Sequence, residues 1–145
     1  MATVRAIREL TATVPLASRL WTDLSRWPTF IDGFGHVAEV DESWPAPGAK
    51  LVWESGPAGR GRVTERMLEC DERHVLTEVF DAQMHGRQAV FFEPGQVTMQ
   101  LDYELANAGP FSRITDVLFI RRALAMALER TLRRFSTEAA DEASL

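Results

Sequence analysis

The C-terminal part of the sequence is one long helical pattern, and this pattern constrains the fold more than any other feature. Across residues 110–140 apolar side chains recur with the period of an amphipathic helix. The apolar stripe consists of Ile114, Val117, Leu118, Leu124, Ala125, Leu128, Leu132 and Phe135. A helix of about 30 residues is about 45 Å long. Because the stripe must be buried, we expect a sheet that the helix crosses completely.

The middle of the chain supplies strands for that sheet. Segments rich in strand-forming residues and separated by short turn signals occupy residues 37–41, 50–55, 62–70, 75–81, 88–93 and 96–105, and residues 3–10 form a further strand pattern. Pro94 and Gly95 fit the centre of a type II turn, in which glycine supplies the positive φ. Because the connections are short, we expect an antiparallel meander and no parallel crossover units.

The last strand pattern shows which of its faces is covered. Its apolar side carries Val97, Met99, Leu101, Tyr103 and Leu105, and its other side is polar. Two other strands leave the choice open. In residues 62–70 either Glu65 or Arg66 has to share a face with apolar residues, and in residues 75–81 Glu78 does so. A charge among inward residues is costly unless it is paired or wetted, so these are edge positions or parts of a wet cavity.

An aromatic stretch joins the first helix pattern to the sheet. Residues 14–24 have helical spacing, with Pro15 at the first helical position, and Pro28 predicts that this helix ends by Arg26. The stretch L-S-R-W-P-T-F-I-D-G-F-G then carries four large apolar side chains, Trp27, Phe30, Ile31 and Phe34. We expect it to form a lid or side wall of a cavity between the sheet and the long helix.

Composition excludes several classes of protein. The chain has 145 residues and a net charge of −5, without a basic tail or stripe, so we expect no nucleic-acid binding. A single cysteine, Cys70, cannot form an internal disulfide, and no run resembles a signal peptide or a membrane span. The histidines lack metal-ligand spacing, and we expect neither a metal nor a cofactor. We therefore expect one cytoplasmic domain over residues 1–145, not inserted into membranes, with a frayed tail at about 137–145.

The predicted order is a strand, one or two short helices, six strands and a long helix. It indicates an α+β domain in which a curved seven-stranded antiparallel sheet wraps around the C-terminal helix. The stretches V-P-L-A-S-R-L-W-T-D-L-S-R-W-P-T-F-I-D-G-F and W-P-A-P-G-A-K-L-V-W-E, with G-P-F-S-R before the last helix, make the sequence similar to a known superfamily. It resembles the START-like helix-grip (SRPBCC) superfamily, and within it the polyketide cyclase/dehydrase-like group.

That resemblance implies a container for a hydrophobic small molecule, polyketide-like or lipid-like, in a cavity between the sheet and the C-terminal helix. The alternative that it implies is a polyketide aromatase/cyclase, which confines a poly-keto chain and stabilises an enolate. We expect a monomer or weak homodimer. A third hypothesis, a partner-binding module, comes from Phe119 and Met126, which the helical pattern places on the polar side.

The predicted site follows from the covered faces. The residues expected to bind the ligand are Trp27, Phe30, Phe34, Trp53, Phe91, Met99, Leu101, Tyr103, Ile114, Leu118 and Arg121. The Tyr103 hydroxyl can donate to a ligand carbonyl or be satisfied as part of the core. Arg121 can hold an anionic oxygen or turn to solvent. Tyr103, Arg121 and Glu78 are the candidate catalysts, and Glu54, Glu65 or Glu78 becomes a base if burial raises its pKa.

Overall fold

The computed structural model describes residues 1–57, 59–106 and 114–145, with side chains from Val117 onward in the last range. Its elements are β1 (Ala2–Glu9), α1 (Val14–Thr22), the 3₁₀ turn η1 (Leu24–Arg26), α2 (Trp27–Phe30), β2 (Phe34–Val40), β3 (Lys50–Ser55), β4 (Arg62–Cys70), β5 (His74–Phe80), β6 (Met84–Glu93), β7 (Gln96–Leu105) and α3 (Ile114–Ala143). Within these ranges the strands form one seven-stranded sheet in the order β1-β7-β6-β5-β4-β3-β2. The predicted α+β fold class is confirmed.

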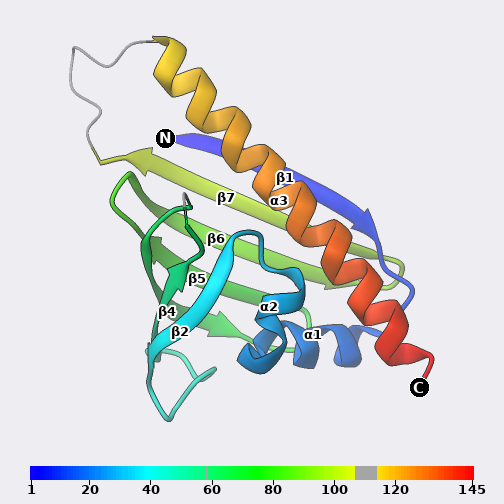
Figure 1. Cartoon of the computed structure of the whole chain (residues 1–145). Coiled ribbons are helices and arrows are strands. Elements are labelled where there is room, and N and C mark those ends of the chain that lie inside the picture. The colour runs from blue at the N-terminus through cyan, green and yellow to red at the C-terminus, as the bar shows by residue number, and fades with distance from the viewer. Residues whose placement is uncertain (58, 107–113) are drawn as a thin grey trace.

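All neighbouring strands are antiparallel, and β2 to β7 follow one another as a meander. Strand β1 is an edge strand that pairs with β7, from Ala2 opposite Tyr103 to Glu9 opposite Gln96. The turn between β6 and β7 has Gly95 at φ 84°, the left-handed conformation that its glycine predicts. In Figure 1, α3 lies across the sheet close to β1 and β7, and α1 and α2 lie beside its C-terminal half.

The first helix ends before Arg26, as the sequence predicted, but Pro28 is not the residue that ends it. Helix α1 ends at Thr22, where the Asp23 backbone N–H donates to Leu20 and the Asp23 carboxylate accepts from Ser25. Pro28 therefore does not end α1. It lies in the first turn of the separate helix α2, where its missing N–H leaves no hydrogen bond unmade.

Two of the aromatic side chains of this stretch are core residues. Phe30 is fully buried and packs against Trp21 and Phe135, with ring centroids 5.3 and 5.1 Å away. Trp27 is also buried, and its indole Nε1 donates to the Trp21 carbonyl over 2.7 Å. The stretch thus packs α1 against the C-terminal half of α3.

The predicted fraying at about residue 137 is wrong, because α3 continues to Ala143. Ala139 is fully buried, and Arg26 forms ion pairs with Glu138 and Glu142 over 3.1 and 3.0 Å. The sequence pattern could not show these tertiary contacts, which hold the last turns in place. Among the described residues, no helix is both long and apolar enough to cross a membrane.

Strands β6 and β7 approach each other closely at Gly86. A side chain at Gly86 would collide with the backbone of Asp102 and Tyr103, so the β7 backbone occupies the place of a β-carbon. Only glycine accepts so close an approach between strands. The concave face of the sheet faces α3 (Figure 1).

Candidate ligand-binding cavity

A cavity of about 650 Å³ lies between the concave face of the sheet and α3. Its apolar lining includes Trp53, Met99, Leu101, Phe119, Leu124 and Leu128, and its polar lining includes Asp32, Arg60, Glu65, Gln83, Gln88 and Thr131. This volume is in the range of pockets that enclose drug-sized molecules. The mixture of a large apolar wall with a few polar groups is also typical of such pockets.

The cavity exists because the sheet grips only one half of α3. Leu128, Leu132 and Phe135 of the C-terminal half are buried, whereas Leu118 and Phe119 near the other end are 59% and 74% exposed. The small side chains of Ala123 and Ala127 line the cavity between these two regions. These two small side chains leave space between α3 and the concave face, and the larger Phe119, Leu124 and Leu128 border that space.

A carboxyl group is buried in the wall of this cavity. Glu65 on β4 is 4% exposed, and its sheet neighbours in the same row are Leu51 on β3 and Val79 on β5. Its oxygens accept hydrogen bonds from Trp53 Nε1 over 2.8 Å and from Thr77 Oγ1 over 3.2 Å. Because Trp53 and Thr77 lie on the strands on either side of β4, the sheet itself fixes the carboxyl group.

Burial raises the pKa of the Glu65 carboxyl. The hydrogen bond from Trp53, the charge of Arg60 and the hydrogen bond from Thr77 act in the opposite direction, but burial prevails. A carboxyl group in a cavity wall with a raised pKa is a recurring property of functional sites.

Arg60 lies beside this group on the connection between β3 and β4. Its Nε donates to Asp81 Oδ2 over 2.7 Å, and its guanidinium carbon lies 6.0 Å from the centre of the Trp53 ring. The Asp81 side chain is 3% exposed, so this ion pair is shielded from solvent on one side. Arg60 therefore forms its ion pair with Asp81, and it acts on Glu65 only through the electrostatic effect of its charge.

The structure decides the register that the sequence left open. Glu65 points inward together with the buried Val63 and Met67, and Arg66 is exposed on the other face. Glu78 lies between the buried Thr77 and Val79, so it points away from the cavity and is opposite Arg66 and Arg87. The prediction of Glu78 as a catalyst in the cavity is therefore wrong, because Glu65 is the acid that points inward.

The predicted ligand-binding residues fall into separate groups. Trp53, Met99 and Leu101 line the cavity. Phe34 packs on Trp53, with the ring centroids 5.4 Å apart, but is not itself part of the lining. Trp27 and Phe30 belong to the hydrophobic core. Tyr103 is buried on the inward face, where burial raises the pKa of its hydroxyl and the Arg121 charge opposes this. Tyr103 is not part of the lining.

The remaining predicted site residues point elsewhere. Phe91 is on the outer face of the sheet, where it stacks on His74 at 5.3 Å, because the inward residues of β6 are the neighbouring Val90 and Phe92. Leu118 and Arg121 are exposed and are not part of the cavity lining. The side chain of Ile114 is outside the described residues.

Sequence reasoning missed several lining residues. Phe119 borders the cavity although the helical pattern places it on the polar side and its side chain is largely exposed. Arg60 and Gln83 come from turns, where no periodic pattern marks the inward side. Gln88 on β6 could have been found, since it alternates with Val90 and Phe92, which are buried on the inward face.

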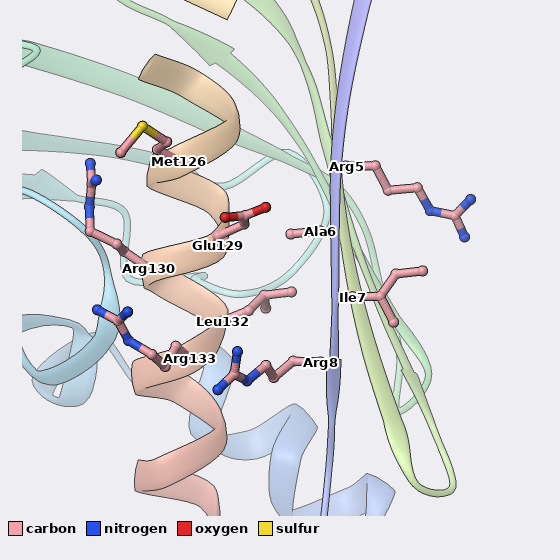
Figure 2. A pocket seen from close by; sticks show the side chains of 9 residues that line it. All are labelled: Arg5, Ala6, Ile7, Arg8, Met126, Glu129, Arg130, Leu132 and Arg133. Atoms are coloured by element: carbon pink, nitrogen blue, oxygen red, sulfur yellow. The ribbon is translucent and has the colours of Figure 1, made fainter. Parts of the chain in front are cut away.

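A second hollow of about 710 Å³ lies between β1 and α3 (Figure 2). Ala6, Arg8, Glu129 and Leu132 point into the space between the strand and the helix, whereas Arg5 points away from the helix. Arg8 and Glu129 are exposed, so this hollow is an open groove. Among the described residues, no group of three or more His, Cys, Asp or Glu side chains is placed to hold a metal ion.

Comparisons with known proteins identify the fold. Neither protein-family models nor curated protein sequences give a match. Solved structures do match over nearly the whole chain. A protein from Thermus thermophilus is 17% identical, with a TM-score of 0.75, and the match covers 97% of this chain and 99% of that one.

Two further solved structures carry names that describe a function. The di-domain ARO/CYC protein StfQ of the steffimycin biosynthetic pathway is 12% identical with a TM-score of 0.78, and the match covers 99% of this chain and 52% of StfQ. Norcoclaurine synthase from Thalictrum flavum is 13% identical with a TM-score of 0.66, with 96% and 86% covered. This chain has the helix-grip fold. The resemblance seen in the sequence is confirmed at the level of the fold, and this chain spans about half of StfQ.

Proposed function

We propose that this protein binds a largely apolar small molecule in the cavity between the sheet and α3. The cavity of about 650 Å³ carries this proposal, because it combines an apolar wall with a fixed polar group. Trp53, Met99 and Leu101 on the sheet and Leu124 and Leu128 on α3 provide apolar surfaces on two opposite sides. Burial of a ligand between such surfaces is favoured by about 25 cal/mol for each Å² of apolar area.

The fold neighbours support the choice of ligands to assay. StfQ is described as a di-domain ARO/CYC protein from the steffimycin biosynthetic pathway, and the fold of this chain matches about half of it. The resemblance seen in the sequence implies a polyketide-like or lipid-like ligand. Polyketide-like and lipid-like molecules are therefore the first classes to offer to the cavity. Native mass spectrometry of the purified protein, searching for a co-purified small molecule, identifies the ligand directly.

The first experiment closes the cavity. We expect Ala127→Phe to weaken binding of a neutral naphthalene ketone dye at least tenfold, because the added ring occupies the space between α3 and the sheet. The dye's emission reports transfer from water to an apolar site. Thr137→Phe, on an exposed position of the same helix, is the matched control and should bind like the wild-type protein. Equal dye affinity in all three proteins would place binding elsewhere and overturn the proposal.

A second candidate function is acid/base catalysis, such as that of an aromatase/cyclase, and Glu65 favours it. In this reaction the Glu65 carboxylate takes up a proton from the carbon next to a ligand carbonyl. The electron pair of that C–H bond forms a C=C bond, and the π electron pair of the carbonyl moves to its oxygen, which gives an enolate and a protonated Glu65. The raised pKa makes the ionised group a stronger base. Proton exchange at that carbon in heavy water, followed by NMR, tests this. Catalysed exchange that Glu65→Gln abolishes supports an enzyme, and exchange at the background rate contradicts it.

A further inference from the structure

Packing alone does not explain Glu65. It lies between Leu51 and Val79 on the concave face, at a place where an apolar side chain would continue the wall. Removing a carboxyl group from water is unfavourable unless its hydrogen-bonding capacity is satisfied. Both Glu65 oxygens already accept a hydrogen bond, from Trp53 Nε1 and Thr77 Oγ1, so the group left for the cavity to pair is the proton of the neutral acid.

The charges around Glu65 do not provide a direct counterion. Facing the cavity are Arg60 from the β3–β4 connection, Asp32 from the connection after α2 and Arg130 from α3. Arg60 is paired with Asp81, and Asp32 is paired with Arg130 over 3.0 Å. None of the ion pairs among the described residues includes Glu65. Burial without a counterion favours the protonated carboxyl group, in agreement with its raised pKa.

A protonated carboxyl group has one O–H to donate. The Trp53 indole cannot receive this hydrogen, because it is only a donor. The Thr77 hydroxyl is 3.2 Å from Oε1, which is long for a bond between two oxygens. A ligand oxygen in the cavity can approach to about 2.7 Å, and Gln88, opposite Thr77 in the register and part of the lining, offers a second donor.

We propose that Glu65 in its neutral form donates a hydrogen bond to an uncharged oxygen, a carbonyl or a hydroxyl, at the polar end of the bound ligand. This inference rests on the proposed function, and it names the feature that the cavity selects. Ligands with a neutral oxygen bind more tightly than matched hydrocarbons, and a cationic ligand is not preferred, because it would require the buried group to ionise.

The test compares matched dyes in four proteins. The dyes are the naphthalene ketone, its analogue with the carbonyl reduced to CH₂, and an analogue with an ammonium group in place of the carbonyl. The proteins are the wild type, Glu65→Gln, Glu65→Leu and Thr77→Val. Circular dichroism confirms folding, and the close match in shape between Glu and Gln keeps the test valid if Glu65→Leu fails to fold.

At a pH below the pKa of Glu65, we expect the wild-type protein to prefer the ketone over the hydrocarbon about tenfold, the usual effect of one hydrogen bond. Glu65→Gln keeps the preference through its amide N–H, and Glu65→Leu loses it. Thr77→Val keeps it, because Thr77 does not contact the ligand oxygen. As pH rises past the pKa of Glu65, the wild-type preference falls while that of Glu65→Gln stays constant.

The possible failures are distinguishable. If ketone and hydrocarbon bind equally to the wild type, the inference about Glu65 is overturned while the proposed function stands. If the ammonium dye binds best, Glu65 is ionised and the inference is overturned. If no dye binds to the wild type and Ala127→Phe changes nothing, both this inference and the proposed function are wrong.

Discussion

Glu65 shows how its neighbours in the sheet determine the chemistry of one side chain. Its burial follows from the register of β4, which places it on the same face as Val63 and Met67. Its two hydrogen bonds come from Trp53 and Thr77, on the adjacent strands β3 and β5. The raised pKa of this carboxyl is thus a consequence of strand pairing, and it affects stability as well as binding.

Replacement of Glu65 by glutamine should stabilise the protein at alkaline pH. Because the folded protein holds the Glu65 proton more tightly than the unfolded chain, wild-type stability falls as pH rises from the ordinary carboxyl pKa toward the raised one. Each unit of pKa difference corresponds to about 1.4 kcal/mol. Urea denaturation should therefore give similar unfolding free energies for both proteins at about pH 5, and a more stable Glu65→Gln at about pH 8. A difference that is independent of pH would contradict a proton held by Glu65.

The β6–β7 hairpin forms part of the cavity wall. Gly86 lets the backbone of Asp102 and Tyr103 approach closely. Further along β7, Met99 and Leu101 line the cavity. The hairpin therefore contributes side chains to the site and depends on a glycine for its close strand pairing.

Substitution of Gly86 by alanine should destabilise the protein by about 2 kcal/mol, the usual cost of forcing an extra carbon into a packed region. The new β-carbon meets backbone atoms of β7, which cannot move aside without breaking the ladder. Gly56→Ala is the control, because the nearest atom to its added carbon is 3.9 Å away. Denaturant unfolding curves measure both changes, and equal effects at the two glycines would show that the close approach at Gly86 does not matter.

The arrangement of the molecule as a whole leaves α3 unevenly supported. Its C-terminal half packs on the aromatic core around Trp21 and Phe135, and Arg26 holds its last turns. Asp32 ties its middle to the connection after α2 through Arg130 and Arg134, whose hydrogen bonds and charges lower the pKa of Asp32 although burial alone would raise it. From Val117 to Ala123 the helix has no buried side chain, and this segment borders the cavity.

Hydrogen exchange should follow this division. We expect the amides of residues 117–124 to exchange faster than those of residues 128–139, because few buried contacts oppose local opening there. A ligand in the cavity contacts Phe119, Ile120 and Leu124, so saturation with the ketone dye should slow exchange in residues 117–124 severalfold. Ala127→Phe, with its weakened dye binding, should show a much smaller change at a dye concentration that only just saturates the wild-type protein. Slowing confined to the C-terminal half would place the ligand outside this cavity.

Most elements and their order could be predicted from the sequence. The period of the long helix, the alternation of residues 96–105 and the Pro94–Gly95 turn depend on local backbone preferences and on the burial of one face, and all of them can be recognised along the chain. The alternation of residues 96–105 also predicted Met99 and Leu101 as inward residues, because clean alternation leaves little choice of face.

The composition of the site depends on tertiary packing. Glu65 and Glu78 are equally acidic in the sequence, and strand pairing turned one inward and the other outward. In the same way, packing made Trp27 and Phe30 part of the core, and Arg26 extended α3 beyond its apolar stripe. The physical reason is that burial, and with it the pKa of a carboxyl group, depends on atoms from distant segments, whereas helices and strands depend mainly on neighbours in the chain.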